Sequence, residues 1–261
     1  MLWTGPEIYT IASGSSGNCV FVSSGDTSLL VDAGVSMRVI SKALAELGSD
    51  LSQIDALLVT HEHSDHIKAL PMLASHYGFP IYMPSGCLHG LPADMDRSSV
   101  RPMPNGGFTL NVGDIKVTAF PTPHDSIASV GYVFEMCGRR FGLATDMGMP
   151  TKNVAEALCG CESVIIEANY EKTMLENGPY PDFLKQRIAS NRGHLENTDC
   201  AKMIAYLALE GSTGSFMLAH LSDKNNTPER ALETVKNYLA DKDISVDIKV
   251  AARSGISKLV G

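Results

Sequence analysis

Four residues of the six-residue run His61–His66 (HEHSDH) are candidate ligands for divalent metal ions, and they are His61, His63, Asp65 and His66. The run follows the apolar segment 56–60. In an extended segment His61, His63 and Asp65 share one parity, so their side chains can converge on one point with His66 adjacent. Imidazole nitrogen and carboxylate oxygen together suit Zn²⁺, Mn²⁺ or Fe²⁺. The run therefore predicts a metal site rather than an exposed polar loop.

Three more candidate ligands each stand directly after an expected strand, and they are His124, Asp146 and His220. Binding residues concentrate on loops that a rigid scaffold holds in place, so we expect these three to complete the site. A carboxylate such as Asp146 can bridge two metal ions through its two oxygens. Any one of the three alone is more often structural, but together with the run they form a consistent set.

The elements that must position these residues are short strands interspersed with helices. Strands are expected at 7–12, 19–23, 28–32, 56–60, 80–83, 115–121, 130–136, 140–145, 163–167, 215–219 and 246–251. Helices are expected at 36–47, 67–76, 152–158, 181–189, 198–209 and 228–240. Segment 56–60 is apolar throughout, which predicts burial on both faces. With no repeat or linker, we expect one domain over residues 1–261, of class α/β (α+β), with two sheets between helix layers.

Composition places the chain among ordinary globular proteins, with 44% hydrophobic and 19% charged residues. A net charge of -8 disfavours broad attraction to a polyanion but leaves room for a locally basic groove. No apolar run approaches the ~18 residues of a membrane span, and the first residues lack the pattern of a leader. The six scattered cysteines predict reduced thiols. The pair Cys159 and Cys161 supplies too few ligands to complete a tetrahedral metal site. We therefore expect a cytoplasmic protein without membrane association.

The order of the candidate ligands resembles the metallo-β-lactamase superfamily, whose fold is a four-layer αββα sandwich. The resemblance implies two metal sites, the first formed by His61, His63 and His124 and the second by Asp65, His66 and His220, with Asp146 bridging them. The cofactors implied are two divalent ions, Zn or Mn, with Fe as a further option. The segment Val31–Gly34 also matches the early Asp-x-Gly turn of this superfamily, where Asp32 is expected to support the ligands.

Four further segments resemble the YycJ (WalJ) subgroup of bacterial metal-dependent hydrolases, and they are Ala12–Cys19, Gly178–Pro181 with Leu184–Ile188, Gly193–Asn197 and His220–Asn226. That subgroup is described as DNA exonuclease-like and is akin to tRNA 3′-processing and phosphonate-pathway phosphodiesterases. The resemblance implies a dinuclear metal-dependent hydrolase. Its expected partner is a nucleic acid or another phosphodiester, most simply as a 5′-exonuclease-like enzyme on DNA or RNA.

Hydrolysis of a phosphodiester needs one group beyond the ligands. Two metal ions about 3.5–4 Å apart can generate a nucleophile at neutral pH and hold the attacking and leaving oxygens. A further side chain must steady the other oxygens or protonate the leaving alkoxide. His194 is the candidate, because the subgroup resemblance covers it and it precedes an expected helix, where an anion is favoured. The alternative is an ordinary loop histidine. Asp65 and His194 are the residues expected to act in catalysis.

Two other features have two interpretations each. Segment 13–18 presents backbone N–H groups and hydroxyls to a phosphate, or is only a tight hairpin turn. Four basic residues also have two interpretations: they contact a nucleic-acid backbone, or they are ordinary solvated surface charges. They are Lys185, Arg187, Arg192 and Lys224. His76 and His89 lie in expected helical stretches and are interpreted as structural.

Fold alone does not choose the reaction, because the same two-metal arrangement serves thioester, lactam and phosphodiester hydrolysis. A glyoxalase II-like thioesterase is the rival, but it predicts a C-terminal helical extension, whereas one helix and one strand are expected after His220. An inserted second domain is disfavoured, because segment 146–220 cannot hold another ~100 residues. A non-catalytic binding module on this fold is expected to have lost ligands, and all seven are present.

Overall fold

Successive side chains of the central strands pack into two different hydrophobic layers. In β1 (Glu7–Ala12) Ile8 joins the cluster between the sheets, while Tyr9 and Ile11 join a cluster on the other face. Leu57 and Leu58 of β4 (Ala56–Leu58) divide in the same way, and both are fully buried. Because side chains alternate across a strand, each sheet is covered on both faces. The computed structural model describes residues 5–261, so part of the N-terminal segment considered for a leader lies outside the described residues.

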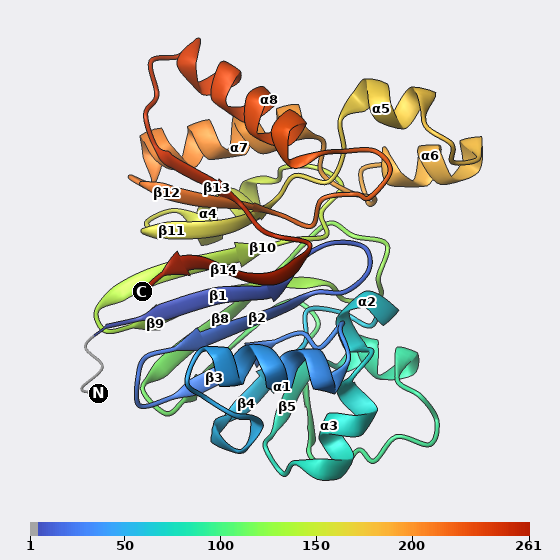
Figure 1. The fold of residues 1–261 in the computed structure, drawn as a ribbon, viewed down its shortest axis with the longest axis vertical. Helices are drawn as coiled ribbons and strands as arrows, with labels where there is room; N and C mark the ends of the chain where they lie inside the picture. The colour runs from blue at the N-terminus through green and yellow to red at the C-terminus, as the bar shows by residue number, and fades with distance from the viewer. Residues whose placement is uncertain (1–4) are drawn as a thin grey trace.

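Two seven-stranded sheets stack against each other (Figure 1). The first has the order β14 (Ser254–Val260), β1, β2 (Cys19–Ser23), β3 (Ser28–Val31), β4, β5 (Ile81–Pro84) and β6 (Val100–Met103). The second has the order β13 (Asp247–Val250), β12 (Ser215–Ala219), β11 (Ser163–Glu167), β10 (Arg139–Ala144), β9 (Val130–Met136), β8 (Ile115–Pro121) and β7 (Phe108–Val112).

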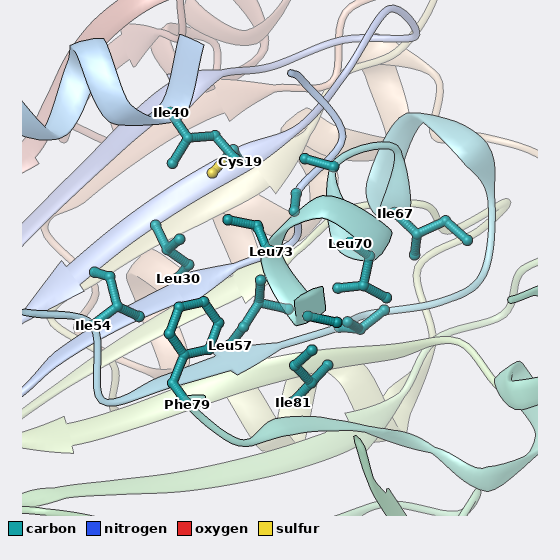
Figure 2. Close-up of a cluster of buried hydrophobic side chains, with 14 of the residues drawn as sticks. Cys19, Leu30, Ile40, Ile54, Leu57, Ile67, Leu70, Leu73, Phe79 and Ile81 are labelled. Atoms are coloured by element: carbon teal, nitrogen blue, oxygen red, sulfur yellow. The ribbon is translucent and has the colours of Figure 1, made fainter. Parts of the chain in front are cut away.

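Helices cover the outer face of each sheet. On the first sheet lie α1 (Met37–Glu46), α2 (Ser64–Ile67) and α3 (Leu70–His76), and on the second α4 (Lys152–Leu158), α7 (Asn197–Glu210) and α8 (Pro228–Ala240). Figure 2 shows Ile40 of α1 and Leu70 and Leu73 of α3 pointing onto the first sheet. Each such buried side chain contributes about 1.5–3 kcal/mol through the hydrophobic effect. The expected four-layer αββα sandwich is confirmed.

Two short helices stand apart from these layers. They are α5 (Lys172–Asn177) and α6 (Asp182–Ile188), and Figure 1 shows them protruding at the same end of the sandwich as α2. Their apolar side chains form a separate small cluster of Tyr170, Leu175 and Ile188, with Tyr180 and Leu184 packed against it. We call residues 170–188 the α5–α6 arm.

Most expected elements are present within a residue or two of their predicted bounds. Helix α5 and the short strands β6 and β7 were not expected. The sequence of β6 is partly exposed and does not alternate, whereas β7 alternates apolar and polar residues and could have been recognised. Strand β14 was also missed, and it pairs antiparallel with β1 in the first sheet. The expectation of a single strand after the last helix is therefore wrong. Nothing local in a strand indicates that its partner lies more than 200 residues away.

Helix starts show two further differences. The expected helix 67–76 is two helices, the first of which begins already at Ser64 inside the metal-binding run. Ser36 occupies the N-cap position of α1, but its side chain makes no capping hydrogen bond. None of the helices within residues 5–261 has the length and apolarity needed to cross a bilayer.

The strand directions bring the candidate ligands to one edge of the molecule. Strands β3, β4 and β5 are parallel, as are β10, β11 and β12. Strand β8 also runs with β10, because both are antiparallel to β9. Loops that follow parallel neighbouring strands meet at a common edge, which is where binding sites form in such sheets.

Candidate metal centre

The HEHSDH run supplies candidate ligands to three overlapping groups that could hold a metal ion, and two of these match the implied sites. His61 and His63 lie with His124, while Asp65 and His66 lie with His220, and in each group one donor atom per residue lies within 4.8 Å of the others. The parity argument is thus correct for the first two residues and wrong for Asp65. Helix α2 begins at Ser64, so Asp65 lies in a helical turn. Its side chain therefore does not follow the two-residue alternation of an extended segment.

Distances within these groups match the edges of a metal coordination shell. His124 Nε2 lies 3.2 Å from His63 Nδ1, and His220 Nε2 lies 3.4 Å from Asp65 Oδ2. His66 Nε2 lies 3.6 Å from that same carboxylate oxygen. Tetrahedral bonds of about 2.0–2.1 Å to a zinc ion place neighbouring ligand atoms about 3.4 Å apart.

Asp146 stands between the two groups. One carboxylate oxygen lies 3.7 Å from His124 Nε2 and the other 3.4 Å from His66 Nε2. The side chain is almost fully buried, and Asp146 follows the end of β10 in a left-handed backbone conformation, with φ of 58°. That conformation costs about 1–3 kcal/mol in a non-glycine residue and is found mainly where function requires it. The geometry fits a bridging carboxylate.

Each imidazole of the cluster has its second nitrogen directed at a protein acceptor. His66 Nδ1 donates to Asp32 (2.8 Å), His220 Nδ1 to Glu167 (2.9 Å), His124 Nδ1 to the Gly193 carbonyl (2.9 Å) and His61 Nδ1 to the Thr60 hydroxyl (2.9 Å), and His63 Nε2 lies 3.6 Å from Asp125. Such partners fix the ring orientation and the tautomer, so the remaining nitrogen faces the centre of the cluster.

Two buried polar atoms at the centre have no hydrogen-bond partner within the described residues, and they are His61 Nε2 and Asp146 Oδ2. Buried polar groups are satisfied in the great majority of cases, so an unpaired nitrogen beside an unpaired carboxylate oxygen needs an explanation. A divalent cation bound between them satisfies both. The donor set and these two atoms together fit a divalent metal centre.

The electrostatics of the cluster point the same way. Burial lowers the pKa of His61 well below its ordinary value and also lowers the pKa of His124, which leaves both imidazoles neutral and able to bind a metal. Burial acts to raise the pKa of Asp146, but the neighbouring imidazoles, His220 first, outweigh it and hold that pKa well below its usual range. Burial acts to lower the pKa of His66, yet Asp146 and Asp32 raise it to about 9. The buried carboxylates therefore require positive charge, which protons or divalent cations can supply.

Asp32 contacts the cluster as the sequence suggested. Its carboxylate accepts from His66 Nδ1 and from the backbone N–H and hydroxyl of Thr60. Two residues later, Gly34 packs so closely on α2 that a Cβ there would lie 1.6 Å from the Asp65 carbonyl oxygen. The turn thus orients one ligand through Asp32 and allows the close approach of the next through Gly34.

His194 lies beside the cluster and is held by a residue that sequence reasoning missed. Its Nδ1 donates to Glu167 (2.8 Å), a fully buried carboxylate that also accepts from His220 Nδ1. Glu167 accepts further from the backbone N–H groups of Met147 and Leu195, at 2.8 and 3.2 Å. Its four donors come from the segments after β10 and β12 and from the loop containing His194. The sequence did contain a signal for Glu167. It is the last residue of an apolar strand, and the other candidate ligands also lie at or just after the ends of strands.

The structure supports the turn interpretation of segment 13–18, and its phosphate contact stays a prediction. It is a tight turn, closed by the Gly17 N–H donating to the Gly14 carbonyl and by the Gly14 N–H donating to the Asn18 side chain. It also reaches the cluster, because Asn18 Nδ2 lies 3.1 Å from His66 Nε2. Ser15 and Ser16 are exposed at its tip.

The four basic residues differ in what they contact. Arg187 pairs with Asp125, and Arg192 donates to the carbonyls of His124 and Ser126, so both reach the loop that contains a candidate ligand. Lys185 donates to the Glu176 carbonyl and Lys224 pairs with Asp223, away from the cluster. His76 and His89 are exposed and belong to neither group of the cluster.

Comparison with known proteins places this geometry in a family. A family model described as a Beta-lactamase superfamily domain matches residues 27–221, which contain all seven candidate ligands. Exodeoxyribonuclease WalJ of Streptococcus pneumoniae serotype 2 is 37% identical over 249 residues, covering 92% of this chain and 91% of that protein. Exodeoxyribonuclease YycJ of Bacillus anthracis is 32% identical over 247 residues, covering 93% of this chain and 92% of that protein.

A solved structure shares the fold. The metallo-beta-lactamase fold protein YhfI from Bacillus subtilis superimposes with a TM-score of 0.74 at 18% sequence identity, covering 98% of this chain and 100% of that one. The motifs, the layered fold and the matches over nearly the whole chain agree. The chain belongs to the beta-lactamase superfamily and, within it, to the family of the WalJ and YycJ proteins.

Proposed function

We propose that this protein is a metal-dependent phosphodiesterase that removes nucleotides from the end of a DNA strand. The observation that supports it best is the arrangement of the five imidazoles, each with one nitrogen near a protein acceptor, in two groups on either side of Asp146. The two relatives above are both named exodeoxyribonucleases. RNA is the alternative substrate.

The proposed cofactors are two divalent ions, zinc or manganese, with iron as a further option. The first would be held by His61, His63 and His124 and the second by Asp65, His66 and His220, with Asp146 available to both. When bound, the two ions supply a water nucleophile of lowered pKa and stabilise negative charge on the phosphoryl oxygens.

The protein's own residues supply the remaining chemistry. Glu167 accepts a hydrogen bond from Nδ1 of His194 and orients the ring, so that Nε2 is placed to transfer a proton at the leaving oxygen. No hydrogen bond within the described part of the chain occupies Nε2. Asp65, whose side chain is 22% exposed, is positioned at the rim to accept a proton from the attacking water. Burial of Asp146 and His61 excludes bulk water from the inner side of the site.

The test is hydrolysis of bis-p-nitrophenyl phosphate and of end-labelled single-stranded DNA and RNA by the purified protein. We expect cleavage of the small diester and stepwise shortening of DNA. Both activities should disappear on chelation and return when zinc or manganese is added. Rapid cleavage of S-lactoylglutathione with all phosphodiesters left intact would replace this proposal with the thioesterase alternative.

A further inference from the structure

Two hollows adjoin the metal cluster at different residues. The first, the Asp65 groove, has a volume of about 460 Å³ and is lined by Ser15, Ser16, Glu62, Ser64, Asp65, Ile67 and Lys68 among others. The second, the α6 cavity, has a volume of about 150 Å³ and lies beside His194. Ser15, at the tip of segment 13–18, lines both hollows, and each hollow also contains a residue of the cluster or its neighbour, Asp65 in the first and His194 in the second.

The lining of the α6 cavity is rich in groups that can donate hydrogen bonds. It contains Arg187, Tyr180, Ser15, Ser222 and His194. Ser222 Oγ accepts from the backbone of Asn225 (3.2 Å), which leaves its own hydrogen free to donate. The one carboxylate in the lining, Asp125, is already paired with Arg187. A cavity of donors with its single carboxylate neutralised favours an anion.

Arg187 is placed to hold that anion. Asp125 accepts from Nε and so fixes the guanidinium plane, and no hydrogen bond from either terminal nitrogen is found within residues 5–261. The side chain is 55% exposed, so a ligand can reach it. A guanidinium presents its nitrogens as a planar fork that matches the oxygens of a phosphate.

Part of the cavity lining is apolar, and it includes side chains of the same helix as Arg187. Tyr180, Leu184 and Ile188 form it, and these belong to the separate hydrophobic cluster of the α5–α6 arm. The end of α6 is tied to the site, because the His194 N–H donates to the Ile188 carbonyl (2.9 Å). A Cβ at Gly193 would lie 2.1 Å from that same carbonyl oxygen, so the contact leaves no space for a side chain. The α6 wall is therefore fixed relative to His194.

The two hollows differ in volume, and the difference indicates what each can bind. Pockets that enclose a drug-sized ligand usually measure about 300–1,000 Å³, a range that includes the Asp65 groove but not the α6 cavity. The smaller space suits one phosphate with part of a nucleoside, and residues of the arm form part of its lining.

We propose that the α6 cavity binds the nucleotide at the end of the DNA strand, with its phosphate on Arg187 and its sugar or base against Tyr180 and Leu184. The rest of the strand then lies in the Asp65 groove, with the scissile bond at the metal cluster between the two. The arm thus acts as a stop that restricts cleavage to strand ends. This inference rests on the proposed phosphodiesterase function.

The test compares Arg187→Ala, Arg187→Lys and a matched control, Lys172→Ala, which removes an exposed positive charge from the same arm outside the cavity. Activity is measured on bis-p-nitrophenyl phosphate and on a labelled single-stranded oligodeoxynucleotide with either a 5′-phosphate or a 5′-hydroxyl. We expect the ratio of oligonucleotide to small-diester activity to fall at least tenfold in R187A, mainly through a higher KM. R187K should recover part of it, and K172A should equal the native protein.

The two oligonucleotides identify which phosphate is bound. A terminal phosphate on Arg187 makes the native protein prefer the phosphorylated end and R187A lose that preference, whereas an internucleotide phosphate gives equal losses on both. An unchanged activity ratio in R187A overturns the inference. So does loss of metal from R187A, because Arg187 would then act through Asp125 on His63. If the native protein hydrolyses no phosphodiester at all, it is the proposed function that fails.

Discussion

His194 and His220 both donate from Nδ1 to the same oxygen of Glu167, yet their other nitrogens meet different surroundings. His220 is 1% exposed, and its Nε2 lies 3.4 Å from Asp65 within the metal cluster. The side chain of His194 is 22% exposed and lines the α6 cavity. Glu167 orients both imidazole rings in the same way. The two histidines therefore differ in what surrounds Nε2 and not in the partner of Nδ1. We propose that His220 binds a metal ion and that His194 transfers a proton, although His194 also lies with Asp146, Glu167 and His220 in a group that could hold an ion.

Replacement of each histidine by alanine tests this separation. His194→Ala should keep its metal and its fold while kcat falls by about 10²–10⁴-fold, the usual effect of losing an acid–base or oxyanion group. His220→Ala and Asp146→Ala should bind less metal, because a ligand is missing from the shell. Metal content and kcat are measured side by side. Metal loss in His194→Ala with full occupancy in His220→Ala would show that the two roles are reversed, and exposed His76→Ala serves as the control.

At the scale of elements, the site depends on how closely α2 approaches the turn after β3. The Ala33 N–H donates to the His66 carbonyl (2.7 Å), and the Asn18 N–H donates to the Asp65 carbonyl (2.8 Å). These backbone contacts fix the helical turn that contains two candidate ligands. They require that Gly34 have no side chain, since a Cβ would overlap the Asp65 carbonyl group.

Gly34→Ala should therefore disturb the second metal group more than the fold. A methyl group forced into a packed contact costs about 1–3 kcal/mol, and here the clash falls on the backbone of Asp65. We expect a lower free energy of unfolding in denaturant titration and weaker metal binding in a chelator competition. Gly78→Ala is the matched control, because nothing lies within 4 Å of a Cβ there. Equal metal affinity in the two variants would contradict this account.

At the scale of the whole molecule, the metal cluster joins the two sheets. The HEHSDH run follows β4 of the first sheet, whereas His124, Asp146 and His220 follow strands of the second. Ions bound between these groups link two layers that otherwise contact each other through apolar side chains. Metal binding is therefore coupled to the stability of the sandwich.

Metal removal should lower the stability of the entire protein. We expect close to two metal ions per chain by elemental analysis and a lower Tm after chelation, restored by adding the metal back. A ligand present at 100 times its Kd stabilises the folded state by about 2.7 kcal/mol. Asp146→Asn should show a smaller metal-dependent shift than the native protein. A Tm that is independent of metal in the native protein would refute the coupling.

The sequence alone was sufficient for the seven candidate ligands, which the structure brings into one cluster, and for most of the strands that precede them. It also placed Asp32 beside the cluster. These predictions succeed because ligand chemistry and two-residue alternation are properties of short segments. The assignment of Asp65 to one point with His61 and His63 failed, because the start of α2 at Ser64 depends on packing against Gly34.

Only the tertiary structure decided the features that depend on distant residues. Strand β14 completes the first sheet through pairing with β1, and no local signal in its sequence required it. Glu167 gained its role only when the loops after β10 and β12 and the loop of His194 met around it. The α6 cavity exists because Gly193 lets the α5–α6 arm pack against the site. A sequence specifies which side chains can do chemistry, whereas the contacts between segments determine which of them share a site.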